Sequence, residues 1–119
     1  MAWSFTGDRP VYIQIADRVK KAVLAGQYGP GEQIPAVRQL ALEAAVNPNT
    51  VQHAFAELEH EGLIVSQGTL GRFVTEDREV IDTVRDRMAR QIAETFVKEM
   101  DQLSLNHEQI RELIREVAL

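Results

Sequence analysis

The chain has 119 residues, of which 45% are hydrophobic and 26% are charged. This length fits one compact domain, or one small domain with an appended helical segment, and excludes a multidomain enzyme. The composition is typical of a folded protein and excludes wholesale disorder. The formal net charge of −5 would not by itself select a protein that binds nucleic acid, because such proteins usually present a basic surface.

Two missing features narrow the chemistry further. The sequence has no cysteine, which excludes disulfide frameworks, thiolate nucleophiles and cysteine-based zinc sites. Its apolar runs are far shorter than the ~20 residues that cross a bilayer, and its start lacks a basic region followed by an apolar stretch. We therefore expect a cytoplasmic protein that makes no contact with a membrane.

Charge, glycine and proline divide the chain near residue 75. Residues 1–75 carry six basic and seven acidic side chains, whereas residues 76–119 carry seven and eleven. All seven glycines and all four prolines lie in the first part. Because these residue types mark turns, we expect a domain of short elements in residues 1–75 and an almost wholly helical tail in residues 76–119.

Three helices are expected in the first part, each with apolar side chains at the spacing of one buried face. Pro10 and Gly26 can begin and end the first helix, and Pro35 can begin a short second one. Asn47 is a good N-cap for the third helix, which Gly62 can terminate. The apolar face of this third helix consists of Val51, Ala54, Phe55 and Leu58.

A β-hairpin is expected after the third helix. Residues 62–65 and 73–75 are β-prone, and the glycines of the connector at residues 67–71 permit a tight reversal. Helix, helix, short turn, helix and hairpin is the element order of a winged helix-turn-helix. The predicted fold class is therefore mainly helical with a small hairpin.

The tail is expected to form two helices. Apolar side chains recur every three or four residues from about Asp77 to Met100, and Asn106 with Gln109 resembles a capping box that begins a second helix. The apolar stripe can fold back on its own domain or pack against a second copy. A helix of roughly 36 Å at ~1.5 Å per residue extends past what the first part can cover, which favours a dimer. The predicted dimer contacts are Ile81, Val84, Met88, Ile92, Phe96, Ile110, Leu113 and Ile114.

The first part contains four runs that are informative together: PVYIQI at residues 10–15, GPGEQIPAVRQLA at 29–41, VNPNTV at 46–51 and ELEHEGLI at 57–64. In this order they resemble the GntR family of bacterial transcription regulators. The NPNT run and the short tail resemble the YtrA-type branch of that family, and over the tail the resemblance rests on length and helicity alone. It implies a dimeric DNA-binding repressor whose tail serves mainly for dimerisation.

The chain departs from this family pattern on the elements that would meet DNA. Many relatives carry basic residues at the positions of Pro48 and Gln52, and serine at the position of Ala36. The usual Gly-x-Gly of the wing keeps only its second glycine, Gly71. We therefore expect a weaker attraction to phosphate than is usual for the fold, and the wing geometry stays open.

Eight residues are candidates for DNA contact, since the start of a third helix reaches base edges in the major groove and helix N-termini bind phosphate. Ordinary structural roles remain open beside this one. Asn47 can be a cap alone, and Arg72 can be a solvated hairpin charge. Arg38 can pair with Glu43 or Glu32 at the surface. The candidates are Arg38, Asn47, Asn49, Thr50, Gln52, His53, Thr69 and Arg72.

Nothing in the sequence supports an enzyme. His53, His60 and His107 lack zinc-ligand spacing, and the chain has neither a phosphate-binding glycine motif nor a nucleophile elbow. We predict no metal site and no cofactor. The predicted function is a homodimeric regulator, expected to be a repressor, that binds a palindromic operator on double-stranded DNA.

Two other functions stay open. The chain could be a winged-helix interaction or dimerisation module that has lost DNA binding, as its acidity allows. It could also sense an unknown small-molecule effector in a pocket between tail and winged domain, although no set of tail residues identifies a ligand. A neutral-to-positive strip joining Lys20, Lys21, Arg38 and Arg72 would favour DNA binding, and an acidic strip would favour the interaction module.

Overall fold

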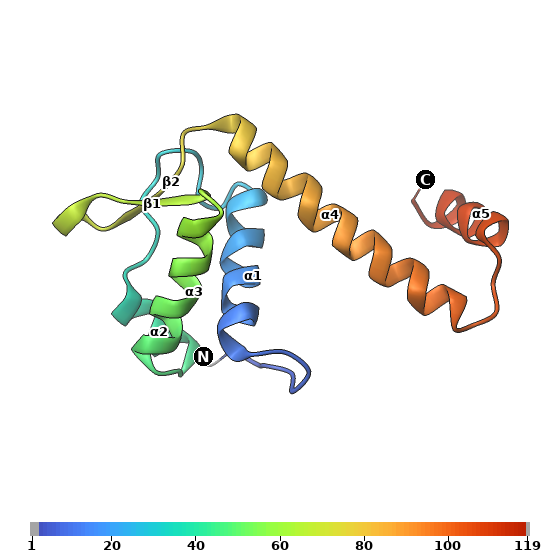
Figure 1. Ribbon diagram of the computed structural model, residues 1–119, viewed down its shortest axis with the longest axis horizontal. Helices are drawn as coiled ribbons and strands as arrows, with labels where there is room; N and C mark the ends of the chain where they lie inside the picture. Colours follow the sequence, from blue (N-terminus) through green and yellow to red (C-terminus); the bar gives the residue numbers. More distant parts are fainter. Residues whose placement is uncertain (1–2, 119) are drawn as a thin grey trace. The chain divides into compact units, whose positions relative to one another are not determined.

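The computed structural model describes residues 3–118. They fall into two compact units, one ending at Val84 and one beginning at Arg85, and each is described by itself. The predicted fold class is confirmed, since helices predominate and one two-stranded antiparallel sheet is present (Figure 1). In chain order the elements are α1 (Val11–Leu24), α2 (Val37–Ala44), α3 (Pro48–His60), β1 (Ile64–Ser66), a 3-10 turn (Gly68–Leu70), β2 (Arg72–Val74), α4 (Arg78–Asp101) and α5 (His107–Ala118).

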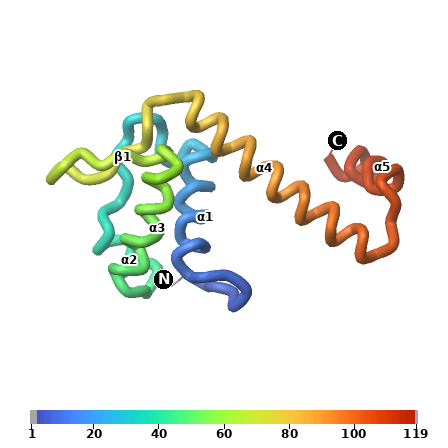
Figure 2. The backbone as a smooth tube through the Cα atoms, in the orientation of Figure 1, coloured from blue at the N-terminus to red at the C-terminus, as the bar shows by residue number. Residues whose placement is uncertain are grey.

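Helices α1 and α3 lie side by side and run in the same direction (Figures 1 and 2). Tyr12 stacks on His53 near the start of both helices, and Lys20 pairs with Glu61 near the end of both. The two contacts are eight residues apart on each helix, or ~12 Å at ~1.5 Å per residue. In this register the start of α3 extends about one turn past the start of α1.

Local chemistry sets the bounds of the helix-turn-helix. The Asn47 side chain accepts a hydrogen bond of 2.8 Å from the Asn49 backbone N–H, and Pro48 is the first helical residue, which confirms the predicted cap. The turn from α2 into α3 contains no glycine. Ala45 instead adopts the left-handed conformation, with φ 57° and ψ 49°, where glycine is the usual residue.

One hydrophobic core joins the three helices to the hairpin. Ile15 of α1, Leu63 and the paired strand residues Ile64 and Val74 are buried, and Ile64 lies opposite Val74 in the antiparallel register. Removal of this apolar surface from water is the main term that stabilises the unit. The apolar face predicted for α3 is confirmed, because at most 1% is exposed of Val51, Ala54, Phe55 and Leu58.

Two hydrogen bonds hold the connector of the wing in place. The predicted reversal at residues 67–71 is present and takes the form of a 3-10 turn, across which the Gln67 N–H donates to the Gly71 carbonyl over 2.8 Å. The distant Gln33 amide donates to the Leu70 carbonyl over 2.7 Å. Gly71 has φ 111°, a backbone conformation that L side chains rarely adopt, so another residue at this position would be strained.

The first unit continues past residue 75 into α4. Ile81 and Val84 are buried members of its core, so their side chains are already covered within their own chain. Little of either side chain is left for a second copy to contact, and their role as dimer contacts stays a prediction. The compact unit ends at Val84, whereas a boundary near residue 75 was predicted. The apolar spacing of α4 is regular throughout, and it does not reveal which partner covers each turn.

In the second unit, α5 begins at the predicted capping box. The Asn106 side chain accepts from the Gln109 N–H over 2.8 Å, and the Gln109 side chain accepts from the Asn106 N–H over 2.9 Å. Ile110 is buried, so it too is covered within the chain. The other predicted dimer contacts stay accessible: Met88, Phe96 and Leu113 are half-buried, and Ile92 and Ile114 are exposed.

Candidate nucleic-acid interface

The first turn of α3 presents polar side chains to solvent. Asn49 and Gln52 are exposed and Thr50 is half-buried, while Val51 faces the core. Within residues 3–118, the Asn49 side chain has no hydrogen-bond partner, so both atoms of its amide are available. An available amide at this place can accept from and donate to the edge of an adenine.

Asn47 has a structural role at the same end of the helix. Its side-chain oxygen is occupied by the Asn49 backbone N–H, and its backbone carbonyl accepts from the Thr50 N–H over 2.9 Å. These two bonds satisfy groups that would otherwise be unpaired at the start of the helix. Asn47 therefore fixes the position of the exposed residues that follow it.

His53 is exposed, but its ring is fixed by α1. The centroids of the His53 and Tyr12 rings are 3.5 Å apart, and the ring planes differ by 7°. This stacking holds the imidazole edge in one orientation at the surface. Sequence reasoning missed Tyr12, although its place in the first turn of α1 could have indicated a partner for α3.

Arg72 connects the wing to α3. Its Nε atom donates to Glu59 over 2.5 Å, and its Nη2 atom donates to the Gln52 side-chain oxygen over 2.9 Å. Its guanidinium carbon also lies 5.1 Å from the centroid of the Phe55 ring. The side chain is therefore neither a free cation nor a solvated hairpin charge.

Sequence reasoning also missed Glu59, the ionic partner of Arg72. Gln52 and Glu59 are seven residues apart, so they share one face of α3. This spacing in the sequence could have indicated that Glu59 lies on the same face as Gln52. Because the Gln52 oxygen accepts from Arg72, its amide nitrogen remains to donate to a base.

Arg38 and Thr69 are two further candidates that are exposed. Arg38 is exposed near the start of α2 and, among the described residues, pairs with neither Glu43 nor Glu32. Thr69 is exposed in the 3-10 turn of the wing. Arg38 and Arg72 border one cavity of about 270 Å³, so the structure brings the start of α2 close to the base of the wing.

Most basic side chains of residues 3–75 already contact an acidic or aromatic side chain of the same chain. The pKa of the Arg9 guanidinium is raised because Asp17 accepts its hydrogen bond. Arg18 lies 4.3 Å from the centroid of the Trp3 ring. In this segment, Lys21 and Arg38 are the basic residues without such a partner. The ion pairs are Arg9–Asp17 at 2.6 Å, Lys20–Glu61 at 2.9 Å and Arg72–Glu59 at 2.5 Å.

Lys20 and Arg72 are each paired with a glutamate, so they add little net positive charge to a strip that would join them with Lys21 and Arg38. Attraction to the phosphate backbone is correspondingly modest. The part of the chain that the structure describes holds no cluster of three or more His, Asp or Glu side chains suited to a metal ion. In the same part, no helix combines the length and apolar character needed to cross a membrane.

Comparison with known proteins identifies relatives of this chain. A family model described as "Bacterial regulatory proteins, gntR family" matches residues 11–74, which extend from α1 to β2. The uncharacterised HTH-type transcriptional regulator YhcF of Bacillus subtilis is 35% identical over 111 residues, or 93% of this chain and 92% of that protein. The HTH-type transcriptional repressor YtrA of the same organism is 41% identical over 68 residues, or 57% of this chain and 52% of that protein.

Solved structures agree with these relatives. A GntR family transcriptional regulator from Listeria monocytogenes has a TM-score of 0.85 and 34% identity, covering 94% of this chain and 98% of that one. The AraR DNA-binding domain in complex with operator ORX1 has a TM-score of 0.58 and 26% identity, covering 60% of this chain and 93% of that one. These proteins are regulators, which confirms that the chain is not an enzyme. The chain therefore belongs to the GntR family and is a DNA-binding transcriptional regulator.

Proposed function

We propose that the protein is a repressor that binds a palindromic operator as a homodimer. The observation that carries this proposal is the exposed first turn of α3, where Asn49 and Gln52 face solvent. The first turn of a recognition helix reads base edges in the major groove. Some of the similar proteins, such as YtrA, are named repressors, which supports repression over activation. Binding to chromosomal DNA would place the protein in the cytoplasm.

The proposed contacts follow from the donor and acceptor groups of each side chain that no described residue occupies. Asn49 pairs with an adenine, and Gln52 donates to an acceptor on the next base pair along the groove. Arg38 binds a phosphate beside the helix-turn-helix. Thr69, at the tip of the wing, lies against the neighbouring backbone.

Exposed apolar side chains of the second unit support the dimer. Four large ones lie among residues 85–118, the smaller of the two units. A second copy related by a twofold axis would cover them and present two recognition helices symmetrically, which requires an inverted-repeat operator. Their exposed fractions are 58% for Ile92, 68% for Leu103, 44% for Ile114 and 78% for Val117.

Selection of bound DNA from a random pool by the purified full chain tests this function. We expect an inverted repeat whose half-sites are one or more helical turns apart. A promoter that overlaps the selected site should be transcribed less in vitro when the protein is added. Failure to enrich any inverted repeat at low salt would instead favour an interaction module that has lost DNA binding.

Gln52→Ala should relax the sequence preference at one position of each half-site. The expected loss of discrimination is about 1–3 kcal/mol at that position, measured by repeated selection and by fluorescence anisotropy on matched duplexes. Gln91→Ala is the control, because Gln91 is equally exposed but lies in the second unit. Identical motifs for the wild type and both variants would contradict a role of Gln52 in base recognition.

A further inference from the structure

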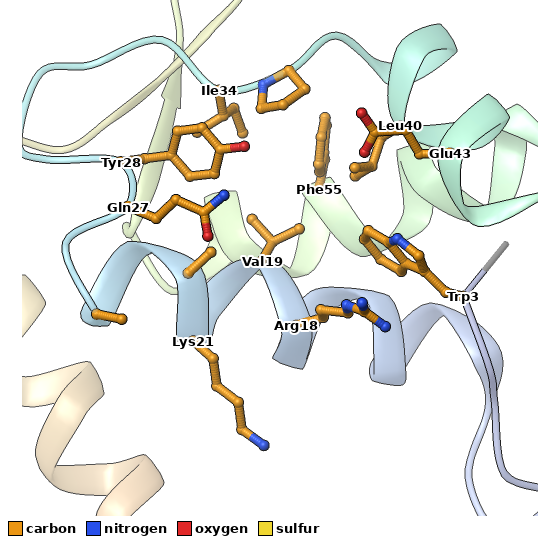
Figure 3. A pocket seen from close by; sticks show the side chains of 13 residues that line it. Trp3, Arg18, Val19, Lys21, Gln27, Tyr28, Ile34, Leu40, Glu43 and Phe55 are labelled. Carbon is orange, nitrogen blue, oxygen red and sulfur yellow. The ribbon is translucent and has the colours of Figure 1, made fainter. Parts of the chain in front are cut away.

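The first unit contains a cavity that the proposed DNA contacts do not use (Figure 3). Its volume is about 450 Å³, within the ~300–1,000 Å³ of small-molecule sites. Side chains from α1, from the loop after it, from α2 and from α3 line the cavity. The apolar part of the lining includes Val19, Ile34, Leu40 and Phe55.

Polar groups around this cavity lack partners. Among the described residues, no hydrogen bond is made by the side chains of Gln27, Tyr28 and Glu43. In Figure 3 the Tyr28 hydroxyl and the Glu43 carboxylate point toward Phe55. Water can satisfy such groups, and a ligand with matching donors and acceptors can replace that water. An apolar lining with a few convergent polar groups is typical of a binding site.

Arg18 supplies the positive charge at this cavity. Its guanidinium lies over the Trp3 ring, 4.3 Å from the centroid, and this cation–π contact restrains it beside the cavity. Arg18 makes no ion pair with any described residue. A guanidinium in this situation can bind a carboxylate through two parallel N–H donors.

We propose that this cavity binds a planar aromatic carboxylate that also carries a hydroxyl or amino group. The carboxylate pairs with Arg18, and the ring packs between Phe55 and Tyr28. The hydroxyl or amino group donates to the Glu43 carboxylate. The site is independent of the operator contacts proposed above, so it can be tested without DNA.

Helix α2 links this site to DNA binding. Leu40 and Glu43 line the cavity, and Arg38 lies on the same helix of eight residues. A helix this short depends on packing for its position. An occupant that changes the packing of Leu40 therefore moves Arg38, and its binding free energy becomes coupled to that of the operator.

The only tryptophan of the chain, Trp3, lines the cavity and reports on it directly. Titration of the full chain with 4-hydroxybenzoate, without DNA, should give a saturable change in Trp3 emission and a matching heat in calorimetry. Benzoate lacks the donor, and 4-hydroxybenzyl alcohol lacks the charge. Each should bind about tenfold more weakly. No saturation by either method up to about 10 mM would overturn the site.

Charge variants separate this site from general attraction of anions. Arg18→Gln should weaken 4-hydroxybenzoate binding about tenfold, whereas Lys98→Gln should leave it unchanged, because Lys98 is an exposed cation of the second unit and does not line the cavity. Glu43→Gln should reduce the preference for 4-hydroxybenzoate over benzoate. Equal effects of the Arg18 and Lys98 changes would overturn the proposed pose. Calorimetry is the readout here, since Arg18 itself affects Trp3 emission.

The link to DNA has a separate readout. Saturating 4-hydroxybenzoate should change the operator Kd of the wild type about fivefold or more, and it should not change that of Arg18→Gln at the same concentration. An unchanged wild-type Kd would overturn the coupling through α2. If the wild type did not bind the operator even without ligand, the proposed function would be contradicted instead. The two failures are therefore distinguishable.

Discussion

At the scale of single residues, Arg72 serves two elements at once. It belongs to β2, yet its guanidinium donates to Glu59 and to Gln52 of α3. An ion pair exposed at the surface contributes only about 0–1 kcal/mol to stability. The importance of this contact is therefore positional, because it fixes the base of the wing and the orientation of the Gln52 amide.

Glu59→Gln should raise the affinity for random DNA, because it removes a carboxylate and releases Arg72 for a phosphate. The slope of log K against log salt should steepen by about 1, measured by anisotropy on a duplex without an operator. Glu57→Gln removes the same charge from the same helix, where no described cation pairs with it, and should leave the slope unchanged. Equal slopes for all three proteins would show that Arg72 does not become available.

Contacts between residues far apart in the chain could not be predicted from the sequence. Arg72 and Gln52 are 20 residues apart, and Gln33 reaches Leu70 across 37 residues. Exposure at the start of α3 follows from local spacing, so the availability of Asn49 could be predicted. The partners of Arg72 could not, because they depend on how the hairpin meets α3.

At the scale of elements, the two asparagines that begin α3 have different roles. Asn47→Ala should lower the free energy of unfolding by about 1 kcal/mol, because the Asn49 N–H loses its acceptor. Asn49→Ala should change stability by less than about 0.5 kcal/mol but weaken operator binding. Urea unfolding followed by circular dichroism and anisotropy separate the two effects. Equal destabilisation by both changes would contradict this division of roles.

The first turns of α4 contribute to the stability of the winged unit. Ile81→Ala should cost about 2–5 kcal/mol in the free energy of unfolding, since Ile81 is buried in the core. Ile92→Ala, on the same helix, should cost little at low protein concentration because Ile92 is exposed. A similar loss for both variants in urea unfolding would contradict the assignment of Ile81 to the first unit.

Elements with strong local signals were predictable. The cap at Asn47 and the capping box at Asn106 each depend on residues two or three positions apart, and both are present. The burial of Ile81 and Val84 was not predictable in the same way. Periodicity identifies an apolar face, whereas the identity of the covering partner is a property of the tertiary structure.

At the scale of the whole molecule, exposed apolar side chains predict assembly. Ile92→Asp and Ile114→Asp, together, should convert the proposed dimer into a monomer at micromolar concentration, because each places a charge in the contact. Light scattering measures the mass directly. Leu42→Asp is the control, since Leu42 is 79% exposed but lies on α2 of the first unit. A wild type that is already monomeric would contradict the dimer.

The ion pairs of the winged unit affect the number of protein molecules that a cell needs to keep the operator occupied. A chromosome offers about 10⁶–10⁹ random sites that compete with the operator. Arg9, Lys20 and Arg72 each pair with a carboxylate of the same chain, so we expect random DNA to retain each molecule only briefly. A larger share of the population is then free at any moment, and a low copy number suffices to keep the operator occupied.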